Sequence, residues 1–275
     1  MAVVGNIDFL ARDVLYDKQK PYRMKFVPPS GFPWSNIKTN IQPQKIEDIR
    51  GREKDFSLGA NGFSLETLDS GMTYKDFDDE DKIVQTYLPN VAKLLRSMLN
   101  PSRIQIFEFL VRKRGESFPL ATETAYEDHQ PTTAAHIDMT QEWASILARR
   151  LNHKSGIHRL PGEHYQFINV WAPIRGPVQD WPLALCDASS LNLHALHAGD
   201  VVFQDFQTEN LLLEHHPEHR WYYVSEQMPT QAWVFLQGDS RGRQCVPHSS
   251  FLHPGAPEKA QPRQSIEVRA LVFTT

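Results

Sequence analysis

Two stretches of the chain carry apolar residues at the spacing of an α-helix. Between Asp79 and Leu99 the apolar positions recur along one face, and Asp78 or Asp79 can cap the first turn. The same spacing over 141–151, with Thr140 as a candidate N-cap, predicts a second helix. The apolar positions of the first helix are Ile83, Tyr87, Val91, Leu94, Leu95 and Met98.

Most of the remaining pattern is that of β-strands. Residues 103–113 alternate in the manner of a strand, and a short strand is expected at 134–138. Further strands, separated by Gly, Pro and Asp clusters, are expected at 164–172, 200–205, 219–225, 231–237, 244–249 and 264–273. Many short strands with few helices are typical of a sandwich or barrel rather than an alternating α/β sheet. The chain is therefore predicted to be mainly β with flanking helices.

The first 75 residues are rich in proline and glycine and show little periodicity. Proline removes a backbone donor and clashes with the preceding turn, so the run Phe26–Trp34 cannot be the interior of a helix. Its aromatic residues indicate a segment that packs over a core. We expect one domain over residues 1–275, with an N-terminal extension at 1–75 and a β-rich core at 100–275.

Composition excludes several classes of protein. The 275 residues carry a net charge of −4 and no basic stretch, which argues against nucleic acid as a partner. The two cysteines, Cys186 and Cys245, do not make a disulfide framework. No apolar run reaches the length of about 18 residues that spans a membrane, and Met1–Leu10 lacks the features of a signal peptide. We expect a cytoplasmic protein that does not bind membranes, and the oligomeric state is left open.

His136-Ile137-Asp138 is a candidate metal-binding dyad. Residues i and i+2 of a strand point to the same face, so His136 and Asp138 could hold one ion from one side. Two histidines and one carboxylate, with open positions opposite, are typical of non-haem iron(II) oxygenases. With 12 histidines and 33 acidic residues, however, roughly one or two His-x-Asp or His-x-Glu pairs arise by chance. The dyad therefore needs a third ligand.

A second pair of this kind, His216-Pro217-Glu218, lies in the run Glu214–His219. Pro217 breaks the strand that would aim His216 and Glu218 at one ion. The run is also hydrophilic and falls between two expected strands. A solvated loop is the preferred interpretation, and a metal site is the alternative.

The third ligand of the dyad has to come from a distant strand. His248 follows His136 across the β-rich half of the chain. His253 is the alternative, but Pro254 follows it and the strand is already ending there. His136, Asp138 and His248 are therefore the candidate catalytic and metal-binding residues.

Two arginines near the end of the chain are candidates for binding a co-substrate. An oxygenase that uses 2-oxoglutarate needs a cation for the far carboxylate, and the two-donor fork of arginine suits it. Arg263 follows His248 after room for a loop and a return strand, and Ser265 lies on the same strand face. Arg269 shares that face and competes for the role.

Asn169 and Trp171 share one face of a predicted strand and are further candidates for cofactor binding. For Trp171 the alternative is an ordinary core residue. Arg112 and Arg114 are interpreted as lying on a solvated strand edge, with the mouth of a barrel as the alternative.

Several longer blocks resemble a known family and together cover most of the chain. They are Tyr126–Thr140, Asn169–Ile174, Gly176–Val178, Trp181–Asp187, His219–Tyr223, Pro247–Phe251 and Pro262–Phe273. In these blocks the chain resembles a fungal and bacterial family of secondary metabolism. That family includes gibberellin desaturase-like proteins and the smaller component of the cephamycin 7-methoxylation system.

The resemblance implies a double-stranded β-helix, a jelly-roll or cupin-like core, with iron(II) on His136, Asp138 and His248 and 2-oxoglutarate near Arg263. It implies a dioxygenase that uses molecular oxygen to hydroxylate, desaturate or cyclise a small natural-product intermediate. The alternatives are a non-oxidative isomerase or cyclase on the same barrel, and a non-catalytic accessory binding protein. One position departs from the family pattern Asn-x-Trp-Arg-Pro, because Ala172 stands in place of the arginine.

The segment Phe26–Asn40 is expected to lie near the metal ligands, with help from Tyr126–Thr133. A reactive metal centre has to be covered from water, and this non-helical, aromatic segment precedes the barrel. The alternative is that the segment only packs on the outer face of a sheet.

Overall fold

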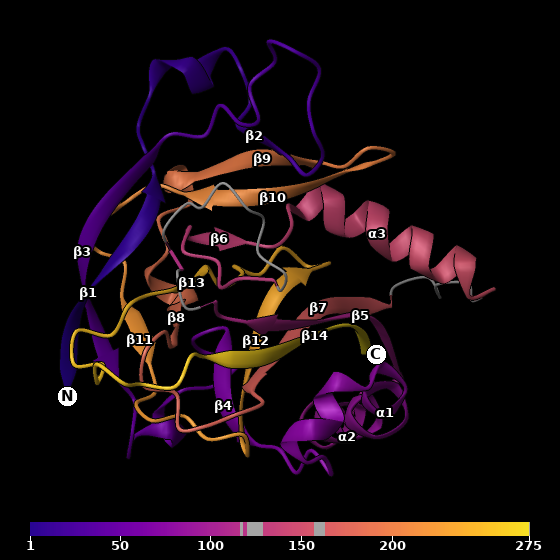
Figure 1. Ribbon diagram of the computed structural model, residues 1–275. Helices are drawn as coiled ribbons and strands as arrows, with labels where there is room; N and C mark the ends of the chain where they lie inside the picture. Colours follow the sequence, from indigo (N-terminus) through magenta and orange to yellow (C-terminus); the bar gives the residue numbers. More distant parts are fainter. Residues whose placement is uncertain (116–117, 120–128, 157–162, 275) are drawn as a thin grey trace.

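Two β-sheets face each other in the computed structural model, which describes residues 1–115, 118–119, 129–156 and 163–274 (Figure 1). The larger sheet carries His136 and His248, and the smaller sheet carries the strand of Arg269. Trp171 and Trp233 of the smaller sheet pack in one buried cluster with residues of the larger sheet. The sheets therefore enclose a common interior, as in a jelly roll, and the prediction of a mainly β chain with flanking helices is confirmed.

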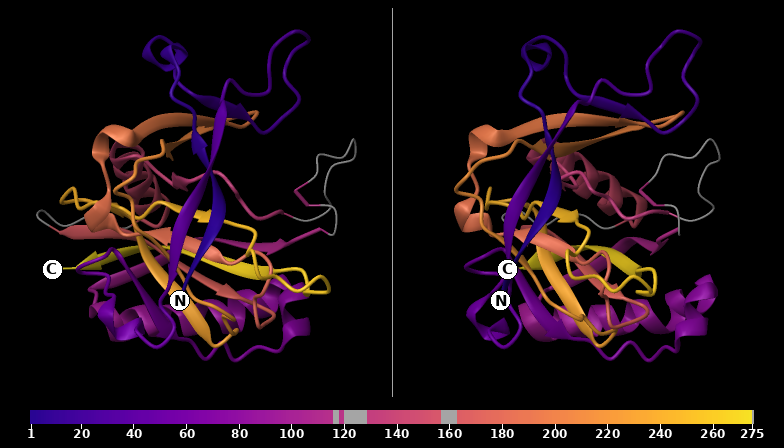
Figure 2. Two further views of the ribbon diagram at one scale, coloured as in Figure 1. Left: turned by 90° about the vertical axis from the view of Figure 1, so that its left-hand side faces the viewer. Right: turned by 60° about the vertical axis from the view of Figure 1, so that its left-hand side comes forward.

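The larger sheet has nine strands in the described residues, in the order β1-β3-β11-β8-β13-β6-β10-β9-β2. These strands are β1 (Ala2–Leu10), β2 (Tyr22–Met24), β3 (Thr39–Asp48), β6 (His136–Ile137), β8 (Leu183–Cys186), β9 (Leu196–Val202), β10 (Gln207–Leu213), β11 (Trp221–Tyr223) and β13 (His248–Ser250). The long pair β1 and β3 crosses one side of the molecule (Figure 2). At the middle of the sheet, β13 and β6 are neighbours.

The smaller sheet has five antiparallel strands in the described residues, in the order β4-β12-β7-β14-β5. They are β4 (Phe63–Thr67), β5 (Arg103–Lys113), β7 (His164–Pro173), β12 (Gln231–Asp239) and β14 (Gln264–Thr274). Strands β7, β12 and β14 consist almost entirely of buried residues, which is why they lie at the centre of this sheet.

The two helical segments pack on opposite faces of the smaller sheet. The predicted first helix is confirmed and consists of α1 (Glu80–Lys82), a π-helical turn η4 (Ile83–Tyr87) and α2 (Leu88–Leu99). Asp79 caps it by accepting the N–H of Lys82. Pro89 has no N–H to donate, which interrupts the regular pattern of helical hydrogen bonds. The π-helical turn η4 lies directly before this interruption. The second helix, α3 (Gln141–Lys154), begins at Thr140, whose hydroxyl accepts the N–H of Trp143.

Alternation along β7 separates the face that packs on α2 from the face directed at the other sheet. Ile168, Val170 and Ala172 pack in one cluster with the apolar face of α2. Asn169 and Trp171 point to the opposite side, because successive residues of a strand face opposite ways. The polar residues of the candidate site are therefore directed between the two sheets. The short turns of the described chain are η1 (Val14–Asp17), η2 (Glu53–Asp55), η3 (Tyr74–Asp78), η5 (Ala188–Ser190) and η6 (Leu193–Ala195).

Several predicted strands differ from the observed ones. The strand expected at 200–205 is β9, which begins at Leu196 and ends at Val202, before a turn into β10. Of the strand expected at 219–225 only β11 forms, and residues 244–247 lie outside any strand before β13. Pro247 lacks the N–H that a central strand needs at this point. The prediction missed β1, β2, β3, β4 and β8 altogether.

Residues 1–75 contribute strands to both sheets. Strands β1, β2 and β3 belong to the larger sheet and β4 to the smaller one. This segment therefore helps to build the sheets themselves, and its division from the core stays a prediction. Among the described helices, none is long and apolar enough to cross a membrane.

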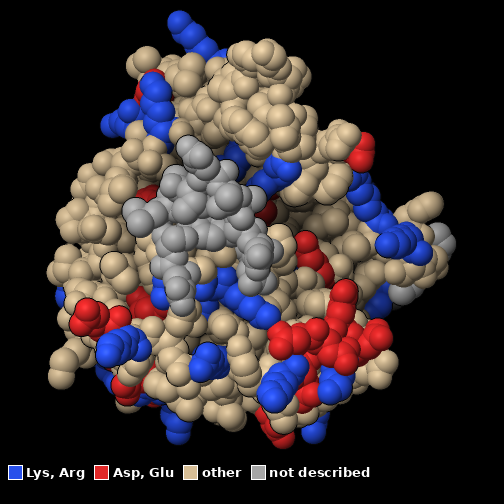
Figure 3. Space-filling model, viewed as in Figure 1, with Lys and Arg blue, Asp and Glu red and all other residues tan. Residues whose placement is uncertain are grey.

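A surface hollow of about 600 Å³ lies between η3, α1 and β5, away from the two histidines. Its lining includes Phe77, Ile106 and Val111 together with the acidic residues Asp78 and Glu80. Figure 3 shows acidic side chains gathered in the part of this face where Figure 1 places α1 and α2. No three of the described residues that line the hollow form a group of potential metal ligands, which makes it a poor candidate for the reactive centre.

Candidate active site

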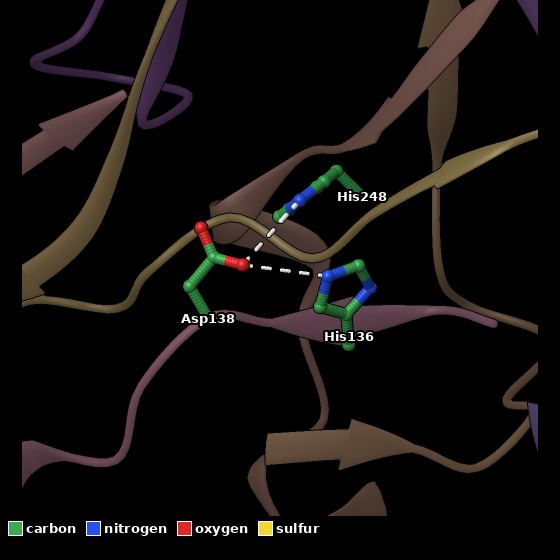
Figure 4. A group of neighbouring side chains, drawn as sticks. All are labelled: His136, Asp138 and His248. Carbon is green, nitrogen blue, oxygen red and sulfur yellow. Dashed lines mark ion pairs between the residues drawn. The ribbon is translucent and has the colours of Figure 1, made fainter. Parts of the chain in front are cut away.

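His136 and His248 lie side by side because the strands that carry them are neighbours. β6 and β13 pair with His248 opposite His136, and the two imidazole centroids are 4.3 Å apart. Asp138 follows β6, and its Oδ1 lies 3.4 Å from His136 Nε2 and 3.9 Å from His248 Nε2 (Figure 4). One potential ligand atom of each residue lies within 4.8 Å of the other two. The structure thus brings together the three residues selected from the sequence.

Backbone carbonyls orient the two imidazoles. His136 Nδ1 lies 2.8 Å from the carbonyl oxygen of Ala134, and His248 Nδ1 lies 3.5 Å from that of Val246. A carbonyl at Nδ1 favours the tautomer in which Nδ1 is protonated and Nε2 carries the lone pair. Both Nε2 atoms therefore face Asp138 in the form that binds a metal ion.

Two buried amides hold Asp138 in place. Asn169 donates a hydrogen bond of 2.6 Å from Nδ2 to Asp138 Oδ2. The side-chain oxygen of Gln237 accepts the backbone N–H of Asp138 at 2.7 Å, while its amide nitrogen donates to the carbonyls of Leu236 and Val246. Gln237 is fully buried on β12. The sequence prediction missed Gln237. The signal that could have indicated it is a single amide side chain directly after the apolar run 232–236.

Burial and charge at the site keep Asp138 and His248 in metal-binding form. Burial would raise the pKa of Asp138, but the charge of Arg269 and contacts with His136 and His248 outweigh it and hold that pKa well below its ordinary value. Burial, together with the neighbouring His136, lowers the pKa of His248 to about 3. Asp138 is therefore an anion and His248 a neutral imidazole near pH 7.

A narrow cavity opens beside these residues and continues to Arg263. Its lining comes from both sheets and includes Thr132, Trp171, Leu183, Ser250 and Glu267. Arg263 is 3% exposed and donates from Nη1 to the carbonyl of Trp181 at 2.9 Å and to Ser250 Oγ at 2.6 Å. The guanidinium is thus fixed at one end of the cavity.

Two polar atoms, on Arg263 and on Ser265 two residues further along the chain, lack a partner among the described residues. Arg263 Nε and Ser265 Oγ are both buried and make no hydrogen bond there. Burial, and then the charge of Arg112, lowers the pKa of Arg263 to about 9. A buried cation with an unsatisfied donor is unfavourable unless an acceptor completes it. The chemistry of this donor set fits the distal carboxylate of 2-oxoglutarate.

Arg269, the other candidate for that role, is already engaged by carboxylates. Its Nη2 lies 3.1 Å from Asp138 Oδ1 and 3.0 Å from Glu267 Oε1, and its Nη1 lies 2.9 Å from Glu108 Oε2. These three anions outweigh the effect of burial and raise its pKa above the ordinary value. Arg263 has an unpaired donor that could bind a ligand, whereas the guanidinium of Arg269 is paired with protein carboxylates.

The remaining residues selected from the sequence fall on different sides of the cavity wall. Trp171 lines the cavity, and Arg263 lies over its ring at 5.3 Å. Arg112 also lines the cavity, and Arg114 forms an ion pair of 2.7 Å with Asp180 in which both side chains are largely buried. The interpretation that both arginines lie on a solvated strand edge was therefore wrong. Ala172 packs toward α2, on the far side of β7. The departure from the family pattern at Ala172 therefore lies outside the site.

The run Glu214–His219 forms the connection between β10 and β11, as the loop interpretation predicted. In the described residues the potential metal ligands that cluster in a group of three are His136, Asp138 and His248, and none comes from this run. His253, the alternative third ligand, lies 3.2 Å from the hydroxyl of Tyr223.

His219, at the end of this run, makes the fold sensitive to acid. It is 6% exposed; burial and the charges of His216 and His215 lower its pKa to about 4, against 6.5 for an ordinary histidine. As the pH falls below 6.5, the unfolded chain takes up this proton first, so stability is lost toward pH 4, by at most about 1.4 kcal/mol per pH unit. Thermal unfolding at pH 7 and pH 5 should show a smaller loss for His219→Gln than for the wild type. An equal loss in both proteins would contradict this.

The segment Phe26–Asn40 lies beyond β9 in the lobe at the top of Figure 1. Its neighbour β2 pairs with β9, and the carbonyl of Trp34 accepts the N–H of Met24. None of the described side chains that line the cavity comes from this segment. Of the Tyr126–Thr133 approach, Tyr126–Asp128 lie outside the described residues, and Thr132 lines the cavity. A part for Phe26–Asn40 in shaping the pocket stays a prediction.

The fold and the site together define a jelly-roll protein with two histidines and one carboxylate at its centre. A solved structure titled "iron and alpha-ketoglutarate-dependent endoperoxidase NvfI with different conformation" shares this fold. It superposes with a TM-score of 0.86 over 99% of this chain and 98% of that chain, at 24% identity. The predicted fold class is thereby confirmed.

Sequence comparison identifies the family. The model of a family described as "Oxidoreductase/YMDC permease-like domain" matches residues 7–273, so this chain belongs to that family of oxidoreductases. The hydroxylase/desaturase efuI of Hormonema carpetanum is 30% identical over 261 residues, 87% of this chain and 86% of the relative. The Fe(II)/2-oxoglutarate-dependent dioxygenase nvfI of Aspergillus novofumigatus is 29% identical over 85% of this chain and 84% of its own. The resemblance to iron(II)/2-oxoglutarate enzymes of secondary metabolism is confirmed, whereas the gibberellin and cephamycin names are not.

Proposed function

We propose that this chain is an iron(II)- and 2-oxoglutarate-dependent oxygenase that hydroxylates, desaturates or cyclises a small natural-product intermediate. In this proposal His136, Asp138 and His248 hold the iron, and Arg263 with Ser265 holds the distal carboxylate of 2-oxoglutarate. One observation carries the proposal. A complete set of two imidazoles and a carboxylate shares a cavity with Arg263. The buried Nε of Arg263, and the buried Oγ of Ser265 two residues further on, have no hydrogen-bond partner among the described residues.

The three ligands suit iron(II). Two neutral imidazoles and one carboxylate on one side of an ion leave the opposite positions open for a chelating co-substrate and for oxygen. Iron and 2-oxoglutarate together supply the oxidising chemistry with molecular oxygen, and the protein supplies binding and orientation. The N–H groups at Nδ1 of both histidines point to backbone carbonyls, which keeps Nε2 free of protons.

The end of the cavity at Arg263 suits a dicarboxylate. Trp181 and Ser250 hold Nη1 of its guanidinium in place, so a ligand that pairs with Nε would be bound at little cost in side-chain entropy. Trp171 packs against the guanidinium and forms one wall, which excludes water from the carboxylate contact. Asn169, selected as a cofactor contact, supports the metal side instead through Asp138.

The substrate would enter the part of the cavity next to the two histidines. Relatives are named hydroxylase/desaturase and endoperoxidase, which indicates that one scaffold serves several oxidations of small molecules. The protein's contribution is to hold the target carbon near the metal and keep water out. The outcome, a hydroxyl, an alkene or a ring, depends on that placement.

An anaerobic titration tests the proposal. Iron(II) added to the protein, followed by 2-oxoglutarate, should give the weak visible charge-transfer band of the chelate, and oxygen should then yield succinate. A non-oxidative isomerase or cyclase, or an accessory binding protein, would give neither oxygen uptake nor succinate. Absence of the band together with absence of succinate would refute the proposed function.

A further inference from the structure

The two oxygens of Asp138 have different surroundings. Figure 4 shows one oxygen directed at both histidines and the other turned away from them. Oδ1 is the oxygen 3.4 Å from His136 Nε2, and Oδ2 accepts the 2.6 Å hydrogen bond of Asn169. The carboxylate is therefore held in one rotation, with a single oxygen toward the metal position.

Arg269 holds the same carboxylate from the other side. Its Nη2 lies 3.1 Å from Oδ1, and the rest of the guanidinium is fixed by Glu267, 3.1 Å from Nε, and by Glu108. The side chains of Asp138 and Glu267 are 4% and 6% exposed, so these contacts are shielded from water and weakly screened by salt. Arg269 is thus held by two further carboxylates while it contacts Asp138.

We propose that Arg269 and Asn169 are positioning residues that restrict Asp138 to one metal-binding oxygen. If both oxygens turned toward one ion, Oδ2 would leave Asn169 and Oδ1 would leave Arg269, and both lost contacts involve a charge. The second oxygen is thereby kept off the metal, and the positions opposite the three ligands stay open for a chelating co-substrate. This inference rests on the proposed function and assigns to Arg269 a role distinct from anchoring 2-oxoglutarate.

The test compares two chelators on the metal-loaded protein under anaerobic conditions. Oxalate chelates through two adjacent oxygens but has no distal arm, whereas 2-oxoglutarate has one. In Arg269→Leu we expect Co(II) and Fe(II) to bind still, while the affinities for oxalate and for 2-oxoglutarate both fall at least about tenfold. The visible absorption of bound Co(II), which changes with the number of ligands, should already differ from the wild type before any chelator is added.

Three further variants make the test specific. Asn169→Ala removes the hydrogen bond to Asp138 Oδ2 and should lower the affinity for oxalate in the same way. This variant allows the test to be made even if Arg269→Leu does not fold. Arg263→Gln should have a lower affinity for 2-oxoglutarate but bind oxalate as the wild type does. Arg220→Gln is the control, since the Arg220 side chain is 56% exposed and pairs with Asp187, and neither residue lines the cavity. It should change neither affinity.

The outcomes separate the two claims. If Arg269→Leu and Asn169→Ala bind oxalate as tightly as the wild type does, the restriction of Asp138 is refuted. If Arg269→Leu lowers the affinity for 2-oxoglutarate but not for oxalate, the restriction of Asp138 is also refuted. Arg269 would then be an anchor for the distal carboxylate. If the wild-type protein with metal binds neither chelator, the proposed function itself fails. Thermal unfolding of each variant shows which proteins are folded.

Discussion

Replacing His248 with alanine is expected to abolish iron binding and oxygen-dependent turnover. The ligand atoms of His136, Asp138 and His248 lie within 4.8 Å of one another, so the loss of one leaves only two protein ligands. We expect the affinity for iron(II) to fall by more than about 100-fold, the upper end of what loss of an outer-sphere partner costs. Equilibrium titration with iron(II) under anaerobic conditions measures this directly, and succinate formation measures turnover.

His253→Ala is the matched control for this experiment. His253 lies on the same connection after β13, and its imidazole lies 3.2 Å from the hydroxyl of Tyr223 rather than near the other ligands. The His253 variant should bind iron like the wild type. Because His248 is buried, His248→Gln provides a better-filled variant in which the metal is still lost. Normal iron binding in both His248 variants, with loss in His253→Ala, would reassign the third ligand.

The three metal-binding candidates could be predicted because strand geometry converts spacing into direction. His136 and Asp138 share a face since side chains alternate along an extended chain, and one distant histidine in the β-rich half sufficed to complete the set. What spacing does not give is the pairing of strands. That β6 lies next to β13, with His136 directly opposite His248, depends on a register set by contacts across the whole sheet.

The supporting residues could not be predicted in the same way. Gln237 acts through the backbone N–H of Asp138, and Asn169 acts through Oδ2, and each contact joins residues far apart in the chain. Arg263 and Arg269 lie on one strand face, and the sequence alone could not decide which of them is the anchor for the co-substrate. They differ in their partners, because acidic residues brought from β5 and from the end of β6 meet Arg269 alone.

The first part of the chain shows where pattern reading failed for the fold. Prolines and glycines suggested an irregular segment, yet β1 buries Gly5, Ile7 and Phe9 in strict alternation. Gly5 occurs there because a Cβ would come within 2.5 Å of the Phe251 ring. Pro43 is accommodated opposite Asn6 in β3. A glycine at a close approach and a proline in a long strand both look like strand breakers when no partner is known.

Replacing Arg263 with glutamine should weaken 2-oxoglutarate binding by a factor of tens to thousands. Loss of one partner from a buried charge-assisted contact costs about 2–5 kcal/mol, which corresponds to that range of dissociation constants. In the proposed site, 2-oxoglutarate would supply the anion that the buried Nε of Arg263 and the hydroxyl of Ser265 lack among the described residues. The dissociation constant is measured by anaerobic titration of the chelate band, and the Michaelis constant for 2-oxoglutarate by succinate formation.

The same contact predicts a difference in thermal stability. Because a ligand that binds only the folded state stabilises it, saturating 2-oxoglutarate should raise the melting temperature of the metal-loaded wild type and raise it much less in Arg263→Gln. Arg220→Gln is the control, since Arg220 is exposed and pairs with Asp187 away from the cavity. If Arg263→Gln retains the wild-type dissociation constant and the full rise in melting temperature, the distal carboxylate is not held at Arg263. The unpartnered donors at that end of the cavity would then have to serve the substrate instead.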